Sequence, residues 1–295
     1  MADAFPRQDS EGVSELLSEE PFRRLHDLLQ SLQSVVVAYS GGVDSAFLLH
    51  VAQLALGGRA RGVLAYSESL DRHEFDDAKE LASRFGWRID VVETNEYANP
   101  EYRKNDGLRC YHCKTELFEV VGRYAREQNL GVVCDGSHAG DRGDYRPGLR
   151  ARDEQSVRSP LMEAELDKEA IRDYSRRLGL PTWDKPAAPC LSSRIPYGSE
   201  VERSKLRAVE AAEHSLRQLG FPVVRVRHHG DVARIEVPLD RVPELLRLGE
   251  TAVEAVRAAG FRFVTVDLEG FRSGSLNRAL EGSLGATGLQ GGSTS

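Results

Sequence analysis

An apolar run, a glycine-containing turn and a second apolar run follow one another from Ser34 to Gly58, in the sequence SVVVAYSGGVDSAFLLHVAQLALGG. It opens with apolar, mostly β-branched residues, which are typical of a strand buried on both faces. A polar turn containing Gly41 and Gly42 follows, and apolar residues then recur at helical spacing. Main-chain N–H groups at a helix N-terminus lie at the positive end of the helix dipole. The stretch therefore predicts an anion site.

The alternation of strand and helix continues along the chain. Such alternation predicts a doubly wound parallel sheet, in which ligands bind outside the carboxyl ends of the strands. We therefore expect Ser40, Ser67 and Gly136 on one rim of the sheet, at the carboxyl ends of its strands. The expected helices cover residues 21–33, 44–56, 71–86 and 111–128, and the expected strands cover residues 34–40, 61–67, 87–94 and 130–137.

The pattern changes in a proline-rich stretch near residues 186–197. Beyond it the sequence favours a helix, two strands, a second helix and a last strand, which together make a smaller α/β domain. The Gly/Ser-rich end reads as disordered. We therefore expect a mobile leader over residues 1–17, a doubly wound domain over 18–188, a C-terminal domain over 189–278 and a disordered tail over 279–295.

Composition excludes several classes of protein. Hydrophobic residues at 40% and charged residues at 29% describe a globular chain, and no apolar run is long enough to span a membrane. The polar N-terminus lacks the features of a signal peptide, so we expect a cytoplasmic protein with no membrane partner. A net charge of -7 argues against a nucleic-acid partner, because phosphate contacts supply most non-specific affinity.

The turn SGGVDS has neither the lysine of a Walker loop nor the spacing of a dinucleotide-binding loop. It resembles the pyrophosphate loop of the ATP pyrophosphatase (PP-loop) superfamily, whose members cleave ATP between the α- and β-phosphates to form an adenylate. The resemblance implies ATP and Mg²⁺ as cofactors, with Asp44 near magnesium or the phosphates and Ser67 near adenine or ribose. It implies pyrophosphate contacts for Ser40, Gly41, Gly42 and Ser45.

Three cysteines form a second candidate site. Cys110 and Cys113 have C-x-x-C spacing, and Cys190 follows in CLSSR. Zinc prefers four ligands, and only His112 and His138 are candidates for a fourth. Three thiolates also suit a four-iron four-sulfur cluster with one open iron, on which a sulfide could bind. Unligated thiols remain the simplest alternative.

The fourth cysteine, Cys134, ends an apolar strand. Cysteine behaves as a small hydrophobic residue when buried. We therefore expect Cys134 to be a core thiol.

Longer motifs carry a closer resemblance. SGGVDS, DGSHAGDRGDYRPGLRA, SPLMEAELDKEAIRDYSRRLGLPTWDKP, CLSSRIPYG and GFPVVRVRHHGDVARIEVP together resemble the LarE family of ATP-dependent sulfur transferases, over about residues 20–278. These enzymes build the nickel-pincer nucleotide cofactor. The resemblance implies that carboxylates of pyridinium-3,5-biscarboxylate mononucleotide are adenylated and then converted to thiocarboxylates. It also implies a homo-oligomer, with a hexamer as one form.

The family uses two sources of sulfur. In one branch a single cysteine before SSR gives up its own sulfur, and in the other three cysteines hold an iron–sulfur cluster. Cys110, Cys113 and Cys190 favour the cluster branch, while a sacrificial Cys190 stays open.

A nucleotide substrate with two carboxylates requires fixed cations. Arg225 and Arg227 alternate along an expected strand, so both point to one face. The resemblance places them, with Ser193, at the substrate phosphate. Lys114 and Arg194 adjoin the cysteines and are candidates to contact the adenylate or a substrate carboxylate, and Glu213 and Glu236 are weaker candidates for a metal or subunit contact.

Three rival functions remain. Some PP-loop tRNA thiolases also combine a C-x-x-C with a distant cysteine, although the acidic net charge argues against RNA. An amide-forming synthetase that uses ammonia would leave the three cysteines unexplained. An adenylate-binding regulator would keep the motifs but release no pyrophosphate.

Overall fold

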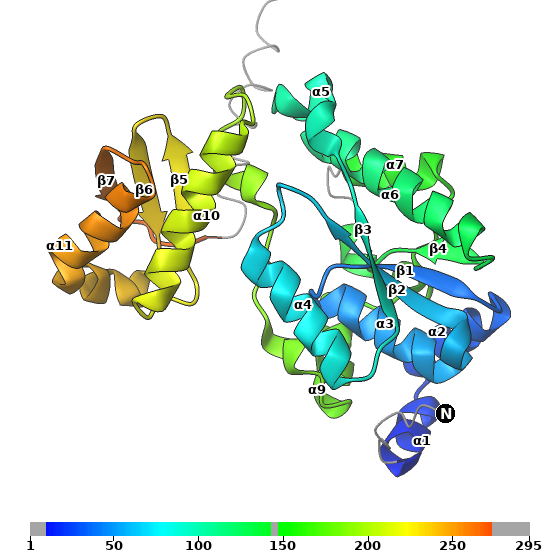
Figure 1. Ribbon diagram of the computed structural model, residues 1–295. Helices are drawn as coiled ribbons and strands as arrows, with labels where there is room; N and C mark the ends of the chain where they lie inside the picture. Colours follow the sequence, from blue (N-terminus) through cyan, green and yellow to red (C-terminus); the bar gives the residue numbers. More distant parts are fainter. Residues whose placement is uncertain (1–9, 143–146, 273–295) are drawn as a thin grey trace, which may run out of the picture. The chain divides into compact units, whose positions relative to one another are not determined.

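The computed structural model describes residues 10–142 and 147–272 (Figure 1). The chain divides into two compact units. The first comprises Met1–Ala98 and Cys110–Ala188, and the second comprises Asn99–Arg109 and Pro189–Ser295. The sequence did not predict that Asn99–Arg109 belongs with the second unit.

The N-terminal region differs from the expected mobile leader over residues 1–17. Helix α1 spans Ser10–Ser18, and Leu16 is buried. Leu16 joins the same hydrophobic cluster as Phe22 and Leu25 of helix α2, so apolar packing orders this segment. Residues 1–9 and the expected tail over 279–295 lie outside the described part of the chain.

The first unit contains a parallel sheet of four strands in the order β3-β2-β1-β4. Side chains of β1 alternate between two cores, with Val35 and Val37 on one face and Val36 on the other. A strand buried on both faces explains the unbroken apolar run of the sequence. The strands are β1 (Val35–Tyr39), β2 (Ala60–Tyr66), β3 (Ile89–Glu93) and β4 (Val132–Cys134).

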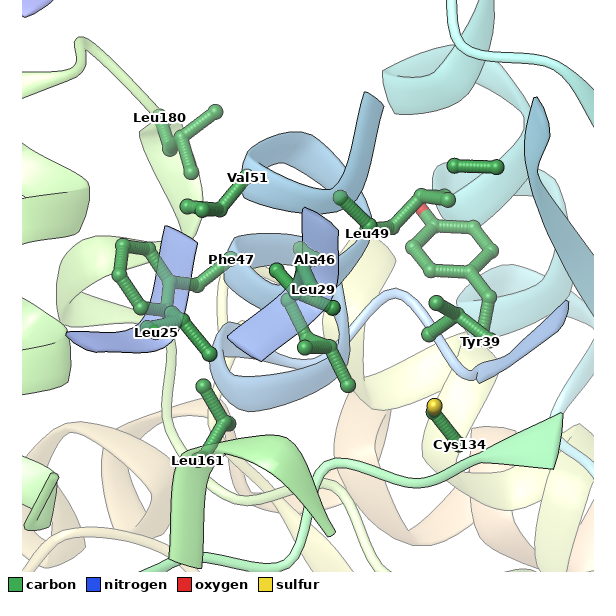
Figure 2. Packing of buried hydrophobic residues seen from close by; sticks show 14 of the residues in the cluster. Leu25, Leu29, Tyr39, Ala46, Phe47, Leu49, Val51, Cys134, Leu161 and Leu180 are labelled. Carbon is green, nitrogen blue, oxygen red and sulfur yellow. The ribbon is translucent and has the colours of Figure 1, made fainter. Parts of the chain in front are cut away.

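Helices cover both faces of this sheet, which confirms the doubly wound prediction. Helices α2, α3, α4 and α9 share the core that contains Val35 and Val37, and α6 packs on the other face through Val121 and Ala125. Helix α3 is almost wholly buried, and Figure 2 shows its Phe47 near Leu25. The helices are α2 (Glu20–Ser31), α3 (Val43–Leu56), α4 (Arg72–Arg84), α6 (Arg109–Glu127), α7 (Pro147–Glu154), α8 (Pro160–Glu163) and α9 (Lys168–Arg177).

The second unit is built on a three-stranded sheet in the order β5-β6-β7, with one antiparallel and one parallel pairing. Val226 and Ile235 are buried, as are Leu206 and Val209 of helix α10. Within residues 10–142 and 147–272, none of the helices combines the length and the apolar character that a membrane span requires. The elements are α5 (Pro100–Arg103), the 3-10 helix η5 (Leu191–Arg194), α10 (Arg203–Gln218), β5 (Arg225–His229), β6 (Val232–Glu236), α11 (Val242–Ala258) and β7 (Phe263–Val266).

Candidate functional site

The SGGVDS turn joins β1 to α3, in the strand–turn–helix order that the sequence predicted. Gly41 has a φ of +72°, a conformation that L side chains rarely adopt. A Cβ added there would lie 2.6 Å from the Cβ of Ala78 in α4. Gly42 is the extended N-cap residue of α3 and supplies no side-chain cap. No side chain of the N-cap residue therefore caps the N-terminus of α3, and its main-chain N–H groups suit a bound anion.

Two hydroxyls brace this turn. The Oγ of Ser45 accepts a hydrogen bond from the main-chain N–H of Ser40 at 3.1 Å and lies 3.0 Å from the Oγ of Ser40. It also donates to the carbonyl of Gly42 at 3.3 Å. The structure thus brings the predicted loop residues together in one small turn.

Gly136 packs against the first turn of α3. A Cβ added to Gly136 would lie 3.0 Å from the main-chain N of Ser45 and 3.3 Å from the Cβ of Asp44. As expected, Ser40, Ser67 and Gly136 follow the carboxyl ends of neighbouring parallel strands. Glycine at position 136 is explained by this close approach.

Asp44 has a cationic partner that lies far from it in the sequence and was not predicted. The Nζ of Lys168 lies 2.7 Å from both carboxylate oxygens of Asp44. Lys168 is the first residue of α9, where the helix dipole disfavours a cation. Lys168 directly follows the capping residue Asp167. A lysine at such an unfavourable position indicates an anionic partner from outside the helix, and this signal was available in the sequence.

Ser67 belongs to a hydroxyl network at the end of β2. Its Oγ lies 3.0 Å from the Oγ of Ser69, which donates to Glu96 at 2.6 Å. Thr94 also donates to Glu96, at 3.2 Å, and the Glu96 side chain is buried. A buried carboxylate therefore fixes the hydroxyls at this rim.

The C-x-x-C pair lies at the start of α6. Cys110 is exposed and Cys113 is partly exposed. Residues three apart lie on one face of a helix, so the two thiols are neighbours. Lys114 follows them, and its Nζ lies 5.3 Å from the ring centre of Phe118.

Cys134 is fully buried, which confirms the prediction of a core thiol. Burial raises the pKa of this thiol, and the carboxylate of Asp135 acts in the same direction. Cys134 therefore stays protonated and unreactive.

The three other cysteines are divided between the units: Cys110 and Cys113 lie in the first, and Cys190 lies in the second. No group of three or more His, Cys, Asp or Glu side chains arranged to hold a metal occurs in residues 10–142 and 147–272. His138, a candidate fourth ligand, instead accepts a hydrogen bond from the main-chain N–H of Gly140 at 3.1 Å.

Arg194 is fully buried in the second unit, two residues after Ser192. Its Nε and Nη2 donate to the two carboxylate oxygens of Glu213, each at 2.9 Å. Its Nη1 donates to the carbonyls of Pro189 and Cys190 and, at 3.1 Å, to the Oγ of Ser193. All three guanidinium nitrogens thus bind protein oxygens, unlike the substrate contact expected for Arg194.

Glu213 lies on the apolar stripe of α10, between Val209 and Leu216. A carboxylate at such a position requires buried partners. The second buried glutamate, Glu236, accepts from Arg227 at 2.7 Å and from Arg234 at 3.1 Å. Arginine pairing therefore explains both glutamates without a metal or subunit contact.

Arg225 and Arg227 flank the core residue Val226 on β5, and both are buried. Arg227 also donates to the carbonyl of Ser193 at 2.9 Å. Burial, followed by the nearby charge of Arg194, lowers the pKa of Arg225 to about 10. Arg225 therefore stays cationic at neutral pH in a desolvated setting, where an anionic ligand would be strongly attracted.

The comparisons with known proteins agree with this geometry. The NAD synthase family model matches residues 24–108, which include the SGGVDS turn. An uncharacterized protein of Synechocystis sp. is 44% identical over 89% of this chain and 98% of its own length. An uncharacterized protein of Methanocaldococcus jannaschii is 27% identical over 82% of this chain and 92% of its own length.

A named relative is more informative. The pyridinium-3,5-bisthiocarboxylic acid mononucleotide synthase of Lactiplantibacillus plantarum is 39% identical over 85% of this chain and 92% of its own length. The match includes both units, because its 253 residues exceed the whole first unit, Met1–Ala98 together with Cys110–Ala188. The chain therefore belongs to the LarE family of PP-loop enzymes.

Proposed function

We propose that this protein is an ATP-dependent sulfur transferase that converts carboxylates of pyridinium-3,5-biscarboxylate mononucleotide to thiocarboxylates. The observation that carries the proposal is the 39% identity to the named synthase over 92% of that enzyme. The geometry of the SGGVDS turn supports the ATP-dependent step, because it is built for an anion at a helix N-terminus.

In the activation step a substrate carboxylate oxygen attacks the α-phosphorus of ATP, and the bond to pyrophosphate breaks. We assign the pyrophosphate to the turn formed by Ser40, Gly41, Gly42 and Ser45. Lys168 would bind phosphate oxygens, and Asp44 would then be released to hold Mg²⁺, whose preferred ligands are oxygens. The rim residues Ser67 and Gly136 would lie beside the nucleoside.

In the second unit Arg225, Arg227 and Ser193 would bind the phosphate of the substrate. The buried cluster supports this role, since it combines the cations of Arg194, Arg225 and Arg227 with only two buried carboxylates, Glu213 and Glu236. Arginine suits phosphate because its fork donates two parallel hydrogen bonds. We assign Arg194 a positioning role, and Lys114 stays a candidate contact for the adenylate.

A sulfur nucleophile then attacks the acyl carbon, and AMP leaves. We propose that Cys110, Cys113 and Cys190 hold a four-iron four-sulfur cluster, which when bound would carry the transferable sulfide. The donor chemistry fits, because thiolates are the ligands that such clusters take, two of the thiols share one helical face, and Cys190 is partly exposed. A sacrificial Cys190 is the competing source of sulfur.

Substrate-dependent formation of pyrophosphate and AMP tests the proposed function. We expect both products with ATP, Mg²⁺, a sulfide source and the pyridinium substrate, together with a thiocarboxylate product. Pyrophosphate release that requires tRNA instead of the pyridinium mononucleotide would identify a tRNA thiolase. Product formation with ammonia and no sulfide would identify an amide-forming synthetase.

The cluster has its own test. The wild-type protein should take up iron and sulfide under anaerobic conditions and become brown, and Cys110→Ala, Cys113→Ala and Cys190→Ala should each remove the colour.

Cytoplasmic location and assembly into a homo-oligomer stay predictions of the sequence.

A further inference from the structure

A buried asparagine joins two distant parts of the sequence within the second unit. Asn105 is fully buried and has a φ of +55°, which asparagine adopts more readily than most residues. Its Nδ2 donates to the carbonyls of Ile195, Pro196 and Ser199 at 3.2, 2.8 and 2.8 Å. The main-chain carbonyl of Asn105 accepts a hydrogen bond from the main-chain N–H of Gly198 at 3.0 Å.

Arg109 extends this network. Its Nη1 donates to the Oδ1 of Asn105 at 2.6 Å and to the carbonyl of Ser192 at 2.8 Å. Its guanidinium carbon lies 5.4 Å from the ring centre of Tyr197, and the residue is buried. The hydroxyl of Tyr102 lies 2.6 Å from that of Ser192. The segment 191–199 is thus held by residues from 102–109.

Both cysteine-bearing segments adjoin this network in sequence. Arg109 is the first residue of α6 and is bonded directly to Cys110. Ser192 lies two residues after Cys190, and Arg194 fixes the carbonyl of Cys190 at 3.0 Å. Polar groups that are buried and fully paired specify one arrangement, because any displacement leaves a donor or acceptor unsatisfied.

We propose that Asn105 and Arg109 are positioning residues for sulfur transfer. They hold the segment that carries Cys190 in one conformation, and they tie it through the peptide chain to the first residue of the C-x-x-C helix. This inference deepens the proposed function, on which it rests. We assign neither residue a contact with substrate, because the hydrogen bonds described above join them to the backbone of the segment that carries Cys190.

Two substitutions test the proposal. Asn105→Asp keeps the shape and the tolerance of positive φ, but it replaces the donor to three carbonyls with an acceptor. Arg109→Lys keeps the charge and loses the planar fork that bridges Asn105 and Ser192. Arg103→Lys is the matched control, since Arg103 lies in the same segment and contacts Glu200 at 3.3 Å in a more exposed pair.

The first readout needs no cluster. Hydrogen exchange of residues 190–199 and maleimide labelling of Cys190 are measured on the full chain, the labelling in a Cys110→Ser, Cys113→Ser background. We expect both rates to rise about tenfold or more in Asn105→Asp and Arg109→Lys and to change little in the control, because hydrogen bonds to charged or buried groups limit local opening. Folded clamp variants with wild-type exchange and labelling would overturn the proposal.

The second readout is iron uptake after anaerobic reconstitution with the three cysteines intact. Asn105→Asp and Arg109→Lys should bind much less iron than the control. Both should retain the wild-type unfolding midpoint of the first unit. Wild-type iron content in a variant whose segment exchanges faster would refute the positioning role. A wild-type protein that takes up no iron would instead contradict the cluster of the proposed function, and exchange and labelling would still decide this inference.

Discussion

Replacing Gly41 with alanine tests whether the turn is shaped by steric necessity. Two separate costs are expected. The first is conformational, because an alanine at a φ of +72° costs about 1 kcal/mol. The second is steric, because the new Cβ would lie 2.6 Å from the Cβ of Ala78, and forced overpacking costs about 1–3 kcal/mol. Gly41→Ala should therefore destabilise the first unit by about 2–4 kcal/mol.

Gly179 provides a control that separates these costs. It has a nearly equal φ of +69°, and nothing lies within 4 Å of an added Cβ. Gly179→Ala should cost only the conformational part, about 1 kcal/mol. Both tryptophans, Trp87 and Trp183, lie in the first unit, so tryptophan fluorescence during urea unfolding reports its stability.

The same pair of variants separates stability from function. Gly41→Ala should also abolish most substrate-dependent pyrophosphate release, because the turn must shift away from α4. Gly179→Ala should retain that activity. Equal destabilisation by the two substitutions, or full activity in Gly41→Ala, would show that the close approach to Ala78 does not shape the turn.

Substitutions of three charged or titratable residues test the assigned roles further. Lys168→Met should lower pyrophosphate formation by about tenfold to a hundredfold, because it removes the cation beside Asp44; unchanged rates would exclude a role in activation. Arg225→Met should raise the Kd of the pyridinium mononucleotide about tenfold or more and leave ATP binding unchanged, and equal losses for both ligands in calorimetry would remove its assigned role. Burial lowers the pKa of His50 to about 4. As the pH falls below about 6.5, the imidazole is therefore protonated in the unfolded chain but stays neutral in the folded protein. Urea unfolding should therefore show a loss of about 2 kcal/mol between pH 7 and pH 5 that is absent in His50→Gln, and the same loss in both proteins would assign it to other groups.

The sequence predicted the sheet well because its signals are local. Apolar strands, the glycine pair and the helical spacing after Asp44 each depend on neighbouring residues, and the structure confirms all of them. The missed helix α1 has a different origin. Its stability comes from burying Leu16 against α2, a tertiary contact that propensity does not record.

Contacts between distant residues were the least predictable part of the site. Lys168 lies 124 positions from Asp44, and Asn105 lies 90 positions from Ile195. Glu213 lies on the apolar stripe of α10, a position that indicates a buried partner, but the sequence suggested a metal or subunit contact where the structure has Arg194. A residue's sequence position near the candidate cysteine Cys190 was a poorer guide, since Arg194 binds Glu213 and the neighbouring backbone.

A single-turnover experiment distinguishes sulfur transfer from every rival reaction. The intact protein and its small-molecule products are analysed by mass spectrometry after a single anaerobic turnover with ATP, Mg²⁺ and pyridinium-3,5-biscarboxylate mononucleotide, starting from reconstituted protein. We expect a substrate that has exchanged a carboxylate oxygen for sulfur, equal amounts of AMP and pyrophosphate, and an unchanged Cys190. An unmodified substrate with no pyrophosphate would contradict sulfur transfer altogether, and dehydroalanine at position 190 would contradict the cluster as the source of sulfur.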